Sequence, residues 1–103
     1  MASPDDFDAH VLWRRSLARR LAEEGRFTEA IELATEAVDL TSDTAPVMRA
    51  YALSDRAVVL SAAGQPDAAA ADTAAALAMH EAKGNRVAID AVRRQASATE
   101  VAR

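Results

Sequence analysis

The chain has 103 residues, a net charge of −4 and no cysteine, and half of its residues are apolar. The missing cysteines exclude a disulfide scaffold, a cysteine-based zinc site and a cysteine nucleophile. The acidic balance argues against nucleic acid as the main partner, because phosphate neutralisation needs a basic face. No apolar run approaches the roughly 20 residues that cross a bilayer, and the acidic start is unlike a secretory signal, so we expect a cytoplasmic protein.

The composition predicts an all-α domain over residues 1–103. Alanine, present 27 times, forms helices readily because it loses no side-chain entropy there. Residues 3–6 combine a capping serine, a proline and two acids, which predicts a first helix that runs to Glu24 and ends at Gly25. The remaining helices are expected at about 27–40, 45–63, 66–83 and, capped by Asn85, from 85 to about 101.

The first pair of helices recurs further along the chain. A shift of 39 residues superposes seven positions of the same kind: Ala18 on Ala57, Leu21 on Leu60, Gly25 on Gly64, Ala30 on Ala69, Ala37 on Ala76, Val38 on Leu77 and Leu40 on Met79. The units span about 4–41 and 45–83, and a capping helix covers about 85–102. A helix–turn–helix unit cannot bury its apolar face alone, so such units stack into a solenoid.

The first unit, with its run Leu17-Ala18-x-x-Leu21-x-x-x-Gly25-x-Phe27-x-Glu29-Ala30-Ile31, resembles the tetratricopeptide repeat (TPR). The resemblance implies a right-handed TPR-like helical solenoid of two hairpins plus a C-terminal capping helix. It also implies a non-catalytic protein–protein interaction module. The chain departs from the family in its period of 39 instead of about 34. It departs again in Arg56, which stands where a large apolar residue is usual, and in the missing prolines after Leu40 and Met79.

A narrower resemblance comes from three segments, residues 10–15, 60–66 and 80–85. They are similar to the C-terminal TPR segments of large actinobacterial regulators that carry nucleotide-cyclase or AAA-type ATPase modules. The resemblance implies a bacterial signalling or transcriptional regulator, of which this chain is either a fragment or a stand-alone relative.

The TPR resemblance also implies a concave peptide-binding groove lined by the first helix of each unit. Its positions here are Leu12, Arg15, Arg19, Ala22, Tyr51, Ser54, Val58 and Ser61. Arg15 and Arg19 match the positions where some family members clamp a carboxylate, which suggests an acidic peptide as partner. Ser54 and Val58 add no basic group, so a full clamp is not expected. Ordinary solvated arginines, with Arg19 paired to Glu23 four residues on, remain the alternative.

We expect no catalytic residue, cofactor or metal site, and therefore no enzyme. His10 and His80 lie on different helices without a second histidine at ligand spacing, so both are interpreted as surface residues. No nucleophile elbow or phosphate loop is present. A stripe of acids at helical spacing indicates a solvated outer surface: Glu29, Glu32, Glu36 and Asp39.

The opening segment holds large apolar residues that predict an association face. They are Phe7, Val11, Leu12 and Trp13. Two units and a cap are fewer than the three or so repeats that usually make a stable solenoid, so we expect a homodimer or a weak monomer–dimer equilibrium. The alternative is that Trp13 and Phe7 pack on Ile31 and the second helix within their own chain. The second candidate function is accordingly a self-association segment of a larger regulator, with no groove ligand of its own.

Overall fold

The computed structural model describes residues 7–41 and 46–102, with side chains described for 9–41 and 46–97. Five α-helices make up this part of the chain, and it contains no strand, so the predicted all-α class is confirmed. The helices are α1 (Phe7–Glu23), α2 (Phe27–Thr41), α3 (Pro46–Ala62), α4 (Pro66–Lys83) and α5 (Arg86–Ala102). The predicted helix start at 3–6 and most of the turn at 42–45 lie outside the described residues.

Glycine ends three of these helices, as the sequence predicted for the first. Gly25, Gly64 and Gly84 have φ values of +80°, +81° and +68°. This left-handed conformation lets the chain leave a helix, and glycine adopts it without a Cβ clash. After Gly84, the side-chain oxygen of Asn85 accepts a 3.2 Å hydrogen bond from the Ala88 N–H, so the predicted cap of α5 is confirmed.

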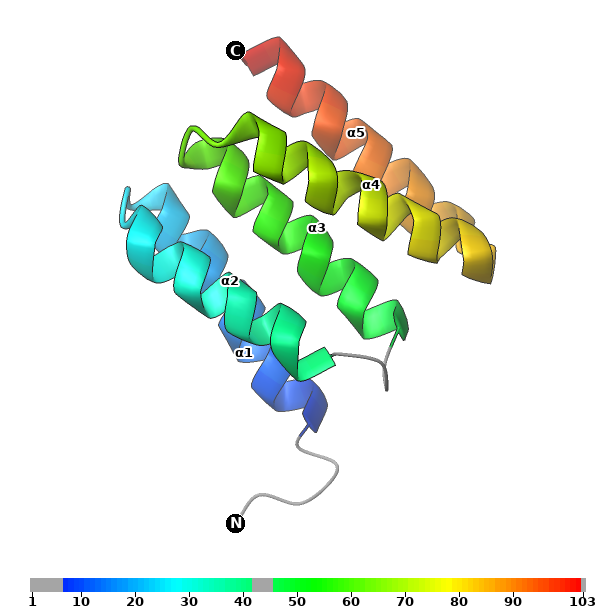
Figure 1. The fold of residues 1–103 in the computed structure, drawn as a ribbon, viewed down its shortest axis with the longest axis horizontal. Helices are drawn as coiled ribbons and strands as arrows, with labels where there is room; N and C mark the ends of the chain where they lie inside the picture. Colours follow the sequence, from blue (N-terminus) through cyan, green and yellow to red (C-terminus); the bar gives the residue numbers. More distant parts are fainter. Residues whose placement is uncertain (1–6, 42–45, 103) are drawn as a thin grey trace.

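α3 runs through the middle of the molecule (Figure 1). The α1–α2 hairpin lies on one side of it, and α4 and α5 lie on the other. The molecule measures 43 × 33 × 18 Å. Its shortest dimension accommodates only two helices of about 10 Å diameter, so every helix has one side near solvent.

Buried alanines mark the close approaches of the helices. Ala18 and Ala30 are fully buried, and their equivalents Ala57 and Ala69 are 6% and 7% exposed. Small side chains at these positions let neighbouring helices approach closely, while leucines, valines and isoleucines fill the space around them. The burial of both sets at equivalent positions fits the 39-residue register.

The turns of the two hairpins also match in their hydrogen bonds. In the first, the Arg26 N–H donates to the Leu21 carbonyl at 2.9 Å. In the second, the Gln65 N–H donates to the Leu60 carbonyl, also at 2.9 Å. Both bonds are the six-to-one bond of a glycine-ended helix, so the two hairpins share one local turn design.

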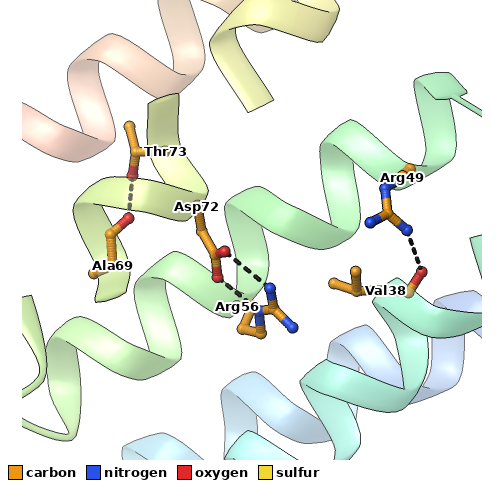
Figure 2. A network of polar contacts seen from close by, with 6 residues as sticks. All are labelled: Val38, Arg49, Arg56, Ala69, Asp72 and Thr73. Atoms are coloured by element: carbon orange, nitrogen blue, oxygen red, sulfur yellow. Dashed lines mark hydrogen bonds and ion pairs between the residues drawn. The ribbon is translucent and has the colours of Figure 1, made fainter. Parts of the chain in front are cut away.

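Side-chain hydrogen bonds link α3 to α4 on one side and to α2 on the other (Figure 2). On α4, Asp72 accepts two hydrogen bonds from Arg56, at 2.6 and 2.9 Å. This hydrogen-bonded pairing raises the pKa of the Arg56 guanidinium. On α2, the Val38 carbonyl accepts a 3.1 Å hydrogen bond from Arg49. These bonds satisfy polar groups that are partly removed from water.

Candidate interaction surfaces

The predicted groove divides into a charged half and an apolar half. In the charged half, Asp55 of α3 is 5% exposed and accepts hydrogen bonds from Arg15 and Arg19 of α1. The Arg19 bond measures 2.9 Å, so Arg19 pairs with Asp55 and not with Glu23 as expected. The Arg15 guanidinium also lies 5.5 Å from the centre of the Tyr51 ring. An internal carboxylate therefore balances much of the positive charge that suggested an acidic ligand.

The apolar half is a cleft of about 290 Å³ between α3, α4 and α5. Three expected groove residues, Ser54, Val58 and Ser61, form its α3 wall. The rest of the lining is mostly small or apolar: Ala57, Pro66, Ala69, Ala70, Thr73, Ala74, Leu77, Val92, Gln95 and Ala96. Among the side chains that the structure describes, no charged one lines it, so the cleft favours an uncharged, apolar group.

Two of the expected groove residues, Ala22 and Ser54, are buried. Ala22 is 8% exposed and packs with Ala18 and Leu21 in the core, so its placement in the groove was wrong. Its small side chain reaches the contact with neighbouring helices and not the open side. Ser54 does line the cleft, and its buried Oγ has no hydrogen-bond partner within the described part of the chain.

His80 is buried, contrary to the surface position expected from the sequence. Only 1% of it is exposed, whereas His10 is exposed as expected. The Tyr51 ring meets the His80 ring edge-on at a centroid distance of 5.0 Å. Burial lowers the pKa of His80 by desolvating the charged imidazolium. The neutral ring therefore acts here as a packing group, and its Nε2 has no partner among the described residues.

The residues of the predicted association face do not form one surface. Val11 is fully buried against Ala37, Val38 and Leu53, so its assignment to that face was wrong. The Phe7 side chain lies outside the described residues. Leu12 and Trp13 are exposed, at 56% and 46%. They diverge, because successive residues point about 100° apart around a helix.

Trp13 makes a contact with its neighbour Arg14. The Arg14 guanidinium lies 4.4 Å from the centre of the indole ring, a cation–π contact. Ile31, the packing partner considered for Trp13, instead contacts Ala57, Leu60 and Ala69 of the second hairpin. Nearly half of the only tryptophan in the chain remains accessible.

The described residues hold neither a metal-binding cluster nor a membrane-spanning helix. They contain no cluster of three or more histidine, aspartate or glutamate side chains that would hold a metal ion. Within the same part of the chain, no helix is both long and apolar enough to cross a bilayer. The acidic stripe of α2 lies in solvent, as expected: Glu29, Glu32, Glu36 and Asp39 are all exposed.

Comparison with protein-family models, with curated proteins and with solved structures finds no match to this chain. Its function must therefore be argued from its own residues. Sequence reasoning missed Asp55, the residue that organises the charged half of the groove. A signal was available, because Asp55 lies in a short polar interruption, Ser54-Asp55-Arg56, between the apolar residues 50–53 and 57–60, where a buried carboxylate requires a cationic partner.

Proposed function

We propose that this chain is a non-catalytic protein-interaction module, built as a right-handed TPR-like solenoid with α5 as its capping helix. The equivalent glycine turns and buried alanines of the two hairpins support this assignment. The resemblance to bacterial regulators suggests that the module acts within a signalling or transcriptional protein. A small enzyme would need a convergent set of acid, base and nucleophile, whereas protein binding needs none.

The observation that carries the proposal is the uncharged cleft between α3, α4 and α5. Its volume of about 290 Å³ is just below the roughly 300–1,000 Å³ typical of small-molecule pockets. This space suits one or two apolar side chains of a protein partner, which would lie against Val58 and Leu77. An aromatic or leucine anchor in such a pocket is the usual source of binding energy at interfaces.

The charged half of the groove is the weaker candidate for the same role. An acidic peptide would have to compete with Asp55, which already accepts hydrogen bonds from Arg15 and Arg19. Displacing a buried carboxylate from two guanidinium groups leaves it unpaired and is costly. The acidic partner therefore remains a prediction, and the cleft points first to a neutral segment.

Peptide display against the purified chain tests the proposal, with two leucine substitutions on one helix as a matched pair. Ala70→Leu fills the cleft, whereas Ala78→Leu adds the same bulk at an exposed α4 position outside the lining. Selected peptides should carry a bulky apolar residue and bind Ala70→Leu at least tenfold more weakly than Ala78→Leu. Circular dichroism confirms that both variants fold.

Equal binding to both variants would place the peptide site outside the cleft. Loss of binding in Arg15→Ala, with Ala70→Leu unaffected, would instead favour the charged half.

A further inference from the structure

The first hairpin presents an outer side that faces away from α3. In α2, Ile31 and Val38 contact residues of α3. Leu33 and Leu40 follow these two residues by two positions, so they lie about 160° away around the helix. Leu40 is 39% exposed, and Leu33 is partly buried.

α1 contributes to the same side by the same spacing. Arg15 faces α3, where it pairs with Asp55. Trp13 and Leu17 lie two positions before and after Arg15, which again turns them away from α3. Trp13 is 46% exposed and Leu17 partly buried. We call the surface formed by Trp13, Leu17, Leu33 and Leu40 the outer face.

An ion pair fixes how the two helices of the outer face are aligned. Arg14 of α1 lies 3.0 Å from Glu36 of α2. Because the helices are antiparallel, three residues further along α1 and three back along α2 bring Leu17 opposite Leu33. The α1 side also carries the exposed Arg20, and the α2 side the exposed Glu29. The outer face therefore carries Arg14 and Arg20 along α1, Glu29 and Glu36 along α2, and apolar residues between the two rows. Within the chain, Glu36 pairs with Arg14 and Glu29 with Arg26.

We propose that a second copy of this chain binds the outer face, with the two-fold axis parallel to α1 and α2. This symmetry places α1 over the partner's α2 at the same height along the axis. Arg14 then meets the partner's Glu36, and Leu17 meets the partner's Leu33. One patch supplies both halves of each contact, as a two-fold interface requires.

Charge selects this symmetry over the other face-to-face arrangement. A two-fold axis perpendicular to the helices would place α1 on the partner's α1. With the axis at the height of Leu17, Arg14 would face the partner's Arg20, and the acids of α2 would also face one another. Such like-charge contacts disfavour an interface. The parallel arrangement replaces them with attractive pairs.

The available area predicts a weak, reversible dimer. Two helices of 17 and 15 residues form a patch of about 25 × 20 Å, or roughly 1,000 Å² buried over both copies. This area is near the lower limit for a specific interface. Trp13 lies within it and is the residue type that most often dominates binding energy. We expect a dissociation constant in the micromolar range.

This inference goes beyond the proposed function, because the outer face and the cleft are formed by different residues. The cleft lies between α3, α4 and α5, whereas the outer face belongs to α1 and α2. Peptide binding in the cleft and dimerisation therefore succeed or fail independently.

Analytical ultracentrifugation across a concentration series tests whether the outer face associates. The wild type should dimerise, and Trp13→Ala should weaken the dimer at least tenfold. Leu12→Ala is the matched control, because Leu12 is an exposed neighbour in α1 outside the outer face. It should dimerise like the wild type. In the unmodified chain, the emission of Trp13 should move to the blue as concentration rises.

A wild type that stays monomeric near millimolar concentration, with unchanged Trp13 emission, would overturn the proposal. An equal loss in Leu12→Ala and Trp13→Ala would also overturn it, because the contact would then not be confined to the outer face.

Charge reversal tests the symmetry. Arg14→Glu and Glu36→Arg should each weaken the dimer about tenfold or more, because each puts like charges together. The double variant Arg14→Glu/Glu36→Arg restores every pair in the parallel arrangement and should dimerise like the wild type. Thermal unfolding verifies the fold of each variant. A double variant weaker than both single variants would contradict the parallel arrangement.

Discussion

The two junctions on either side of α3 share a backbone design but are filled differently. At the first junction, between α1, α2 and α3, Phe27 and Ile31 provide large apolar side chains that pack on the core. At the second, between α3, α4 and α5, the residues 39 positions later are Pro66 and Ala70. Both of these line the cleft. The comparison teaches that the open junction combines smaller side chains with a last helix, α5, that packs less closely on α3 and α4 than α3 packs on α1 and α2.

The first junction also contains larger polar side chains than the second. The first junction is crossed by Arg15 and Arg19, which bind Asp55. Their equivalents are Ser54 and Val58, which leave space in the cleft.

The buried polar residue at the end of each hairpin shows a further contrast. Thr41 is fully buried, and its hydroxyl donates a 2.6 Å hydrogen bond to the Val38 carbonyl. Its equivalent is His80, which is buried with Nε2 unpaired in the described part of the chain. The buried polar side chain at the end of the first hairpin thus has a hydrogen-bond partner, which the Nε2 atom of its equivalent lacks among the described residues.

Enlarging the equivalent alanines should have the largest effect and should distinguish the junctions. Ala18→Leu overfills the closed junction and should lower the free energy of unfolding by about 1–3 kcal/mol. Ala57 is also buried but borders the cleft, so Ala57→Leu should cost less than Ala18→Leu because part of the added side chain can enter that space. Chemical denaturation measures both, and the exposed Glu32→Ala should change stability by less than about 0.5 kcal/mol. Equal losses in the two leucine variants would contradict the contrast.

Removing the carboxylate of the charged half should have the next largest effect. Asp55→Asn keeps the shape but leaves Arg15 and Arg19 without their anion, which should cost about 1–2 kcal/mol. The loss is limited because the Arg19 side chain is 46% exposed and keeps part of its hydration. Arg94→Ala, at the exposed equivalent position of the second junction, should cost less than about 0.5 kcal/mol. Thermal unfolding of both variants at pH 7 makes the comparison.

His80 should make the stability depend on pH. Burial lowers its pKa in the folded state, so below the ordinary value of about 6.5 the unfolded chain binds more protons. The free energy of unfolding should therefore fall as pH decreases from 7 to 5, by at most about 1.4 kcal/mol per pH unit from this residue. His80→Leu should remove this part of the slope, and His10→Leu should retain it. Identical pH profiles for wild type and His80→Leu would contradict the assignment.

Filling the cleft should have the smallest effect, and it should be stabilising. Ala70→Ile gives the second junction the residue that the first has at position 31, and its burial should add about 0.5–1 kcal/mol to the free energy of unfolding. Ala78→Ile places the same side chain on the exposed side of α4. There it gains little burial and loses helix propensity, so stability should not rise. Urea denaturation provides the test, and destabilisation by both would indicate that the cleft is not open to filling.

Helix boundaries and the buried small residues could be predicted from the sequence, because both depend on local chemistry. Gly25 and Gly64 permit the left-handed turn, and the spacing of Ala18 and Ala30 identifies the close contacts. These features recur at one shift of the chain, so two segments supported the same interpretation.

The partners of charged groups could not be predicted in the same way. Spacing along one helix suggested Glu23 for Arg19, but Asp55 comes from another helix and is buried, which strengthens the attraction. Val11 and His80 were wrongly placed on the surface, although Val11 lies seven positions before the buried Ala18 and His80 four positions after the buried Ala76. This spacing puts each of them on the buried side of its helix.

The Val38 carbonyl accepts hydrogen bonds both from Thr41 of its own helix and from Arg49 of α3. The last turn of α2 is therefore completed by the following hairpin, and opening either helix exposes a group of the other. Such shared bonds make neighbouring segments unfold as one cooperative unit. α5 packs through Ala88 and Val92 at the other end of the molecule. Its amide hydrogens should exchange with solvent before those of α2 and α3, and such opening would widen the cleft while the rest of the fold stays intact.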